Sequence, residues 1–314
     1  MAAADQGQPS TLMQRSGATM PVVAIITRTK NRPRMLERAL ESVSKQTFSD
    51  VAWTLVNDGG APGPVESIAQ QARQTGLFVN VIHHQQSCGM EAASNAGIRA
   101  SDSEFVVIHD DDDSWERGYL ETCVGFLREF PRYAGVVTQS TKIEEEVLPD
   151  GIKILTRSPF NPDLLSIYLH EMAQENTFPP ISFLYRRSVI EKVGLYAEDL
   201  PVLGDWEFNL RFLEHSDIGV VPEALANYHH RRNLSDAQSQ YGNSLYAAQN
   251  RHIEYDAVVR NRLLRRDLAL GKPGLGWLVA TGRQHLALRR LDNSIQRLVR
   301  LGSRFGLDRL LRRM

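Results

Sequence analysis

The chain has 314 residues, 42% of them hydrophobic, and its formal net charge is −1 at pH 7. This length and composition suit one large domain, alone or with an appendage, and they exclude a fibrous or intrinsically disordered chain. No apolar run reaches the roughly 18 residues needed to span a bilayer. Cys88 and Cys123 form neither a disulfide framework nor a zinc spacing, so reduced thiols in the cytosol are expected.

Residues 1–20 are polar and unpatterned, and we expect a flexible leader there. Apolar strands and amphipathic helices then alternate as far as residue 138. The expected strands are 22–26, 53–56, 78–83, 105–108 and 134–138, and the expected helices are 36–43, 64–74, 89–99 and 119–130. This alternation predicts an α/β fold with a mostly parallel sheet flanked by helices.

The pattern changes after residue 138. We expect a turn at 149–151, a short amphipathic helix at 162–172 and a strand within 179–187, where Arg186 and Arg187 are interpreted as structural.

The strand at 105–108 organises the sequence, because four consecutive carboxylates follow it. They are Asp110, Asp111, Asp112 and Asp113. Adjacent acids repel one another, and ligands of open parallel sheets bind beyond the carboxyl ends of the strands. The run therefore favours a site for a divalent metal, Mg2+ or Mn2+. The competing interpretation is a solvated turn in which Asp113 or Ser114 caps the next helix.

Further motifs lie on both sides of this run. The loop Thr27-Arg28-Thr29-Lys30-Asn31-Arg32 ends the first strand, Asn57-Asp58-Gly59-Gly60 ends the second, and Asn95 and Gly97 lie on the helix that follows the third. With Asp110 and Asp112 as an Asp-x-Asp pair, the motifs over about residues 21–235 resemble family 2 glycosyltransferases of the GT-A fold.

The resemblance implies a nucleotide-diphosphate sugar as the donor substrate. The residues that it implies for nucleotide binding are Thr27, Thr29, Asn31, Arg32, Asp58, Asn95, Asp110 and Asp111. It also implies a divalent metal held by Asp112 and Asp110, with His229 or His230 as a further ligand. The competing interpretation of the two histidines is a basic surface turn. Ser94 stands where the family often has Arg, and Lys30 stands where an aromatic is common, so contacts to the diphosphate and base are expected to be rearranged.

Sugar transfer also requires removal of a proton from the attacking hydroxyl group. Asp205, in Gly204-Asp205-Trp206-Glu207, resembles the catalytic Glu-Asp element of the family, with Gly204 in place of the usual Glu. Asp205 is therefore the expected general base, and Glu207 is the fallback. The competing interpretation is that Asp205 only caps its helix. His83 and His84 end a strand, but we expect no partner for them.

The charge of the chain is uneven. Residues 271–314 contain ten Lys and Arg against two Asp, which leaves 26 basic and 35 acidic residues in the remainder. In this basic segment Leu288, Leu291, Ile295, Leu298 and Phe305 keep helical spacing. A basic amphipathic helix is typical of contact with an anionic membrane surface, and the competing interpretation is packing on the acidic body or on a second copy. Nucleic acid is not expected as a partner.

We therefore expect an inverting, metal-dependent transferase that moves a sugar to a hydroxyl of a glycan or lipid-linked acceptor in surface polysaccharide synthesis. The expected domains are a GT-A catalytic domain at 21–240, with a nucleotide-binding half (21–115) and an acceptor half (116–240), and a helical, basic extension at 241–314. The expected location is the cytoplasm, with peripheral contact to the inner face of the membrane or self-association through the C-terminal helices.

Two other functions compete with this hypothesis. One is a haloacid-dehalogenase-like phosphatase, because Asp110-x-Asp112 follows an apolar strand, although not the first strand. The other is a GT-A scaffold that binds a sugar nucleotide without turnover. A nucleotidyltransferase is disfavoured because the sequence lacks a Gly-rich loop near its first strand.

Overall fold

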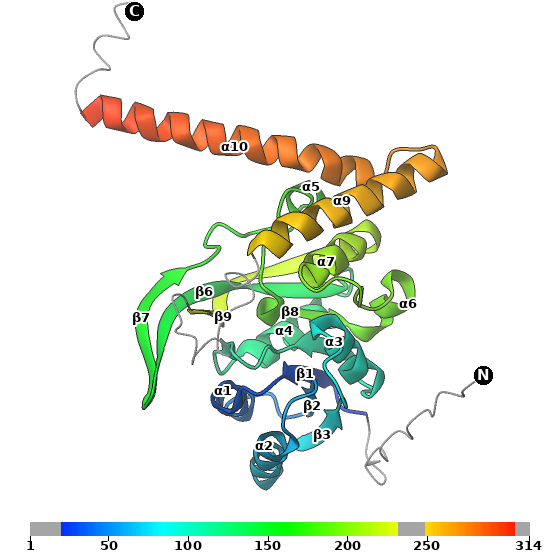
Figure 1. Cartoon of the computed structure of the whole chain (residues 1–314), viewed down its shortest axis with the longest axis vertical. Helices are drawn as coiled ribbons and strands as arrows, with labels where there is room; N and C mark the ends of the chain where they lie inside the picture. Colours follow the sequence, from blue (N-terminus) through cyan, green and yellow to red (C-terminus); the bar gives the residue numbers. More distant parts are fainter. Residues whose placement is uncertain (1–19, 232–248, 305–314) are drawn as a thin grey trace, which may run out of the picture. The chain divides into compact units, whose positions relative to one another are not determined.

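The computed structural model describes residues 20–231 and 249–304 (Figure 1). The expected leader apart from Met20, the expected domain boundary at residue 240 and Phe305 lie outside the described residues. The chain forms two compact units. The first comprises the residues up to Ile167 with Thr177–Tyr255, and the second comprises Tyr168–Asn176 with the residues from Asp256 onward.

The first unit is built on one mixed sheet with the strand order β3-β2-β1-β4-β8-β6-β9-β5, and β7 pairs with β6. The strands are β1 (Val23–Thr29), β2 (Val51–Asn57), β3 (Phe78–His83), β4 (Phe105–Ile108), β5 (Ser114–Trp115), β6 (Gly135–Leu148), β7 (Gly151–Pro159), β8 (Phe183–Arg186) and β9 (Ile218–Arg231). The helices of the whole described chain are α1 (Pro33–Ser44), α2 (Pro62–Gln74), α3 (Met90–Arg99), α4 (Tyr119–Glu129), α5 (Leu169–Met172), α6 (Ile190–Val193), α7 (Gly204–His215), α9 (Gln249–Leu270) and α10 (Leu275–Arg304).

The N-terminal half of the sheet is parallel, as its apolar strands predict. β1 pairs in parallel with β2 and with β4, and β2 pairs in parallel with β3. Strands buried on both faces have continuous apolar sequences, and β1, β2 and β4 are of this kind. Because parallel strands share one carboxyl edge, the loops after β1, β2 and β4 meet there, and these loops carry Asn31, Arg32, Asp58 and residues 110–113 of the predicted site. The C-terminal half is mostly antiparallel, through β4–β8, β6–β8, β6–β7 and β5–β9.

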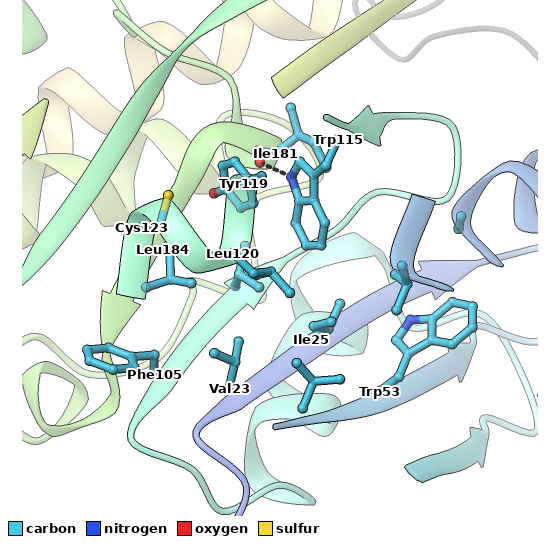
Figure 2. Close-up of a cluster of buried hydrophobic side chains, with 14 of the residues drawn as sticks. Val23, Ile25, Trp53, Phe105, Trp115, Tyr119, Leu120, Cys123, Ile181 and Leu184 are labelled. Atoms are coloured by element: carbon cyan, nitrogen blue, oxygen red, sulfur yellow. Dashed lines mark hydrogen bonds between the residues drawn. The ribbon is translucent and has the colours of Figure 1, made fainter. Parts of the chain in front are cut away.

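Alternate residues of the central strands face two different helical layers. Val23, Ile25 and Trp53 pack with side chains of α1, α2 and α4 in one apolar cluster, part of which Figure 2 shows. On the opposite face Gly97 of α3 lies against Ile26 and Val56 so closely that an added β-carbon would overlap the Ile26 side chain. The sheet is thus covered on both faces, which confirms the predicted α/β architecture.

The expected helix at 162–172 is wrong over most of its length, because only its last turn forms, as α5. The amide of Gln139 donates to the backbone oxygens of Pro162 and Leu164, and Asn161 Oδ1 accepts from the Ser140 N–H. These bonds tie the start of the segment to β6 as a loop, and they override its helical periodicity. The turn at 149–151 is confirmed, since β6 ends at Leu148 and β7 begins at Gly151.

Arg186 and Arg187 have structural roles, as expected. The Arg186 guanidinium donates to the backbone oxygens of Tyr133 and Leu127. The Arg187 guanidinium donates to the backbone oxygens of Ser103 and Ile98.

The second unit contains α5, α10 and most of α9. The buried guanidinium of Arg260 on α9 donates to the carbonyl oxygens of Ala173, Gln174 and Val279, which joins the three helices. The carboxylate of Asp267 accepts hydrogen bonds from the backbone N–H groups of Gly274 and Trp277 and so caps the start of α10. Among the described residues, no helix is both long enough and apolar enough to cross a membrane.

Candidate active site

The acidic loop, defined as residues 110–113, is anchored in the core at both of its ends. His109 and Trp115 lie on either side of it, and their rings meet edge to face with centroids 4.4 Å apart. Both residues also bind the hydroxyl of Ser42, since His109 Nε2 lies 3.0 Å from it and the Trp115 backbone N–H donates to it at 2.8 Å. The Trp115 indole stacks on Tyr119 and donates to the Ile181 carbonyl at 2.7 Å (Figure 2). The two ends of the loop are therefore held by aromatic packing and by hydrogen bonds that do not involve its carboxylates.

Arginines from β1 and from the loop after it neutralise the first part of the acidic loop. Arg28 Nε donates to Asp110 at 2.8 Å. Arg32 forms an ion pair with Asp111 and reaches Asp112 at 3.4 Å. The hydroxyl of Thr29 also donates to Asp111, at 2.6 Å.

The second part of the loop is held from β9. The buried Arg231 forms an ion pair with Asp112, and the backbone N–H of His229 donates to Asp113 at 2.8 Å. Arg231 also pairs with the buried Glu145 of β6. The argument that four adjacent acids imply a waiting metal ion is therefore weakened, because arginine side chains already supply the positive charge.

No residue predicted as a helix cap stands at an N-cap position, although the Asp205 carboxylate does accept a hydrogen bond from the Trp206 backbone N–H in the first turn of α7. Helix α4 has Gly118 at its N-cap, and Ser114 belongs to strand β5 rather than to a helix start. Helix α7 has Leu203 at its N-cap, with no side-chain capping bond, and Asp205 lies one residue inside the first turn.

The carboxylates of the loop differ in ionisation. Burial raises the pKa of Asp111 to about 6, although the Arg32 guanidinium opposes the shift. Burial acts on Asp112 in the same direction, but the guanidinium groups of Arg32 and Arg231 outweigh it and hold its pKa well below the usual range. The Asp112 carboxylate therefore stays charged, and its side chain is 10% exposed.

The two candidate histidines of β9 have different surroundings. The ring of His229 is engaged on both sides, because Nδ1 lies 2.8 Å from Glu145 and Nε2 lies 2.9 Å from the Ser114 hydroxyl. The ring of His230 packs edge to face with the ring of Tyr228, and the two ring centroids are 4.2 Å apart. Both histidines are buried, so the interpretation as a basic surface turn is wrong.

The residues expected to bind the nucleotide fall into two groups. Thr29, Arg32, Asp110 and Asp111 belong to the polar cluster around the acidic loop. Thr27 points into the protein, where its hydroxyl accepts from the Trp53 indole at 2.9 Å, and the exposed Asn31 accepts from the Ala61 backbone N–H at 2.9 Å.

Asp58 lies at the end of β2 and holds the turn that precedes α3. Its carboxylate accepts hydrogen bonds from the Ser87 hydroxyl and from the backbone N–H groups of Cys88 and Gly89, and it lies 2.9 Å from His84 Nδ1. The Asp58 pKa is lowered because these bonds outweigh the effect of burial. His84 thus has a partner that the sequence did not reveal. His83 has two, Asn57 and Glu66.

Asn95 is fully buried on α3 and joins that helix to the segment before α7. Its amide donates to the Tyr196 carbonyl at 2.9 Å and to Glu198 at 2.8 Å, and its carbonyl accepts from the Tyr196 N–H at 3.0 Å. In this structure the side chain therefore positions the polypeptide that leads to Asp205.

Arg28 of β1 and Glu91 of α3 lie beside Ser94 and Gly204, two of the three positions where the sequence departs from the expected motifs. Arg28 Nη1 donates to the Ser94 hydroxyl at 2.9 Å, so an arginine lies beside the residue that replaces the usual Arg. The buried carboxylate of Glu91 lies where a β-carbon on Gly204 would be, and it faces Arg28 at 3.5 Å. Both missing charges are thus supplied from neighbouring elements.

Asp205 lies close enough to this pair to interact with it electrostatically. Burial raises the pKa of Asp205, and among its charged neighbours Arg28 opposes the shift while Asp110 adds to it. Glu207, the fallback base, makes a two-bond ion pair with Arg211 at 2.8 and 2.7 Å, and Arg211 also holds the Leu195 carbonyl. That geometry gives Glu207 a structural role.

A divalent cation fits this site if it arrives with the donor. Asp58, His84 and Cys88 have ligand atoms that lie within 4.8 Å of one another, and among the described residues they are the group of three or more His, Cys, Asp or Glu side chains that meets this criterion. The acidic loop forms no such group. Mg2+ is often bound by one or two carboxylates together with substrate phosphates. The ionised, partly accessible Asp112 meets that requirement.

Comparison with known proteins decides the class of the chain. The model of the family described as glycosyl transferase family 2 matches residues 24–194, more than half of the sequence. The chain belongs to glycosyl transferase family 2. This membership removes the phosphatase interpretation and identifies the protein as a glycosyltransferase that uses a nucleotide sugar.

Individual relatives of this glycosyltransferase are distant. The uncharacterized glycosyltransferase YwdF of Bacillus subtilis is 26% identical over 74% of this chain and 81% of its own length. The GalNAc(5)-diNAcBac-PP-undecaprenol beta-1,3-glucosyltransferase of Campylobacter jejuni is 31% identical over 33% of each chain. The mannosyltransferase PcManGT of Pyrobaculum calidifontis, solved with GDP-Man and Mn2+, matches 90% of this chain and 84% of its own with a TM-score of 0.54 and 17% identity. The last match confirms the GT-A fold.

Sequence reasoning missed several residues of this site. Arg28 was part of a quoted motif, yet nothing in the sequence showed that it would meet Ser94. Glu91 and Glu145 were assigned no role from the sequence, although charged residues within apolar elements are a signal for a buried polar network.

Proposed function

We propose that this glycosyltransferase transfers a sugar, with inversion at the anomeric carbon, from a nucleotide-diphosphate sugar to a hydroxyl of a lipid-linked acceptor, and that it does so with a divalent metal. One observation carries the proposal. Arg28 bonds Asp110 of the acidic loop and interacts with Asp205 at the start of α7, so the proposed metal-binding loop and the proposed base belong to one polar cluster. The Campylobacter relative, whose name specifies an undecaprenol-linked glycan, supports the acceptor class.

Residues 21–115 would bind the nucleotide of the donor, and residues 116–240 would bind the acceptor. Asp112 would hold the metal, with Asp110 beside it. A metal bound there would neutralise the charge that develops on the departing diphosphate. Arg28 and Arg32 are cations that would bind phosphate oxygens once the donor competes with Asp110 and Asp111 for them.

On the acceptor side, Asp205 would act as the general base. It takes the proton of the acceptor hydroxyl, the hydroxyl oxygen forms a bond to the anomeric carbon, and the bond from that carbon to the phosphate oxygen breaks. Attack on the face opposite the leaving group inverts the configuration. The raised pKa of Asp205 suits this role, because a base becomes stronger as its pKa approaches the working pH.

His229 or His230 is the proposed further metal ligand. The ring of His229 is engaged by Glu145 and Ser114 and would have to leave both to bind an ion. Along β9, His229 lies on the same face as Arg231, which bonds Asp112, and His230 points to the opposite face, because side chains alternate along a strand.

The test is donor binding and turnover by the purified protein with a panel of nucleotide sugars, with Mg2+, with Mn2+ and with a chelator. Asp112→Ala is expected to lose metal-dependent donor binding. Asp205→Asn is expected to keep donor binding and to lose turnover by a factor of roughly 100 or more. The exposed Asp163→Asn serves as the matched control and should behave as the unmodified protein.

Two outcomes would contradict the assignments. Turnover retained by Asp205→Asn would remove the base, and donor turnover that is insensitive to chelator and to Asp112→Ala would remove the metal. The anomeric configuration of the product, measured by NMR, tests inversion separately.

A further inference from the structure

Helix α10 has two faces that differ in what covers them. Its first turns pack inside the second unit through Leu275, Val279 and Gly282, all of which are buried. Gly282 lies so close to the Ala173 carbonyl that no larger residue fits there without a shift. This face anchors α10 to α9 and α5.

The other face carries a row of exposed apolar side chains, here called the apolar stripe. It consists of Trp277, Leu288, Leu291 and Ile295, which are between 47% and 62% exposed. At about 100° per residue these four positions fall within roughly 60° of the helix circumference, nearly opposite Leu275, Val279 and Gly282. The packing of the second unit therefore leaves the stripe uncovered, and an exposed row of large apolar side chains marks an interaction surface.

Charge indicates the partner. The 30 residues of α10 include six arginines and one aspartate, and residues 271–314 as a whole contain ten Lys and Arg against two Asp. A positive helix with an apolar stripe is attracted to a surface that combines negative charge with an apolar interior. A tryptophan at one end of such a stripe is also favourable, because its ring prefers the boundary between headgroups and acyl chains.

A second copy of the chain fits these observations less well. The stripe is interrupted at Thr281 and Gln284, which share its side of the helix, so its apolar part covers fewer than the three heptads that a stable coiled coil usually needs. The Thr281 hydroxyl bonds to backbone carbonyls of its own helix. Two helices with this excess of arginine would also repel each other when placed side by side.

We propose that α10 binds the surface of a bilayer rich in anionic phospholipid, with the apolar stripe inserted at the level of the headgroups. The helix lies in the plane of the surface and does not cross it. A peripheral contact of this kind would hold the enzyme at the surface where lipid-linked acceptors are found, so this consequence rests on the proposed acceptor class, whereas the binding itself does not.

The test is cosedimentation of the full chain with large vesicles, either of phosphatidylcholine alone or of phosphatidylcholine and phosphatidylglycerol in equal parts. Binding is expected with the anionic vesicles and should weaken as salt is raised. Trp277 provides a second measurement. The other three tryptophans, Trp53, Trp115 and Trp206, are buried, so a blue shift of emission and quenching by brominated lipid would report on Trp277.

The double variant Leu288→Asp, Leu291→Asp should reduce binding to anionic vesicles by roughly tenfold or more, because it removes apolar area and adds negative charge. Leu165→Asp is the matched control, since Leu165 is 70% exposed and lies in the first unit. Circular dichroism and donor binding in solution establish that the variants are folded.

Three results would overturn the proposal: no binding to anionic vesicles, equal binding to both vesicle types, or unchanged binding by the double variant. A dimer in solution that the double variant dissociates, without vesicle binding, would assign the stripe to a second copy. Because vesicle binding is measured without donor or acceptor, its failure leaves the proposed transfer reaction untouched.

Discussion

The buried carboxylate of Glu91 occupies the space in which a side chain on Gly204 would lie. Glycosyltransferases with the resembling motif usually carry a Glu at that position, directly before the proposed base. Here the negative charge comes instead from α3, and it faces Arg28. The two positions are therefore coupled, and a change at one should depend on the residue at the other.

The first prediction tests this coupling. Gly204→Glu alone should reduce activity and stability strongly, because the new side chain overlaps Glu91 and adds a second buried carboxylate. The double variant Glu91→Ala, Gly204→Glu should recover most of both, since one carboxylate again faces Arg28. Activity and urea unfolding of the unmodified protein, of Gly204→Glu and of the double variant measure the loss and its recovery.

The matched control for that series is Gly125→Glu, because Gly125 is exposed and has no atom within 4 Å of an added β-carbon. This change should have little effect. If the double variant is no better than Gly204→Glu alone, the two side chains do not share a role.

A second prediction concerns Arg28, which faces Glu91 and Asp110 at once. Arg28→Met should lower the free energy of unfolding by about 3 kcal/mol, because it leaves carboxylates in a buried site without their cation. Adding Glu91→Gln should restore part of that loss. Arg99→Met is the control, since its ion pair with Glu198 is exposed, and its effect should be about 1 kcal/mol or less. Equal losses for Arg28→Met and the double variant would show that the two side chains do not interact.

The third prediction is a pH dependence of stability. Burial raises the pKa of Glu91 from 4.5 to about 7, so between these values the folded protein keeps a proton that the unfolded chain releases. This group therefore lowers the free energy of unfolding as pH rises from about 4.5 to 7, by on the order of 3 kcal/mol in all. Glu91→Gln has no such proton and should lack this contribution.

Urea unfolding of the unmodified protein and of Glu91→Gln, at pH 5 and at pH 8, measures the contribution of the Glu91 carboxyl group. The free energy of the unmodified protein minus that of Glu91→Gln should be smaller at pH 8. The interaction with Arg28 is part of this change with pH, because Arg28 opposes the rise of the Glu91 pKa. The exposed Glu129→Gln should follow the unmodified protein. A difference that does not change with pH would contradict the assignment.

A fourth prediction concerns competition for Asp112. Arg231 is bound to the carboxylate that is the proposed metal ligand, so the arginine and a cation compete for its oxygens. Arg231→Gln should bind Mn2+ more tightly, by roughly tenfold, and it should also be less stable because Glu145 and Asp112 lose a buried partner. Electron paramagnetic resonance titration of free Mn2+ measures the affinity.

Arg38→Gln is the matched control for this prediction. Arg38 contacts Glu145 and the backbone oxygen of Asp112 but makes no bond to its carboxylate, so Mn2+ affinity should change much less. Weaker Mn2+ binding by Arg231→Gln than by the unmodified protein would indicate that the ion does not use Asp112.

The fold could be predicted from the sequence where local pattern decides structure. The strands at 78–83 and 105–108 have the expected bounds, because apolar runs of strand length have few other ways to be buried. The prediction of a helix at 162–172 was wrong because contacts distant in sequence, rather than the local pattern, decide the structure there. The periodicity of this segment is helical, but hydrogen bonds with Gln139 and Ser140 of β6, distant in sequence, hold the start of the segment as a loop.

The site could be predicted only in part for the same physical reason. The sequence located the acidic loop, but Arg231, which neutralises Asp112, is 119 residues away from it. Likewise, Ser94 looked like a missing charge, because Arg28 lies 66 residues before it. Long-range pairs of this kind carry no periodic signal, and only the folded chain shows them.

The arginine counter-ions of the acidic loop separate two processes that many metalloproteins couple. Where carboxylates depend on an ion for neutrality, the apoprotein is unstable and the metal acts as part of the folding reaction. Here Arg28, Arg32 and Arg231 already pair with three of the four carboxylates of the loop. If a divalent ion binds at Asp112 as proposed, its supply would therefore affect the rate at which each enzyme molecule works more than the quantity of folded enzyme.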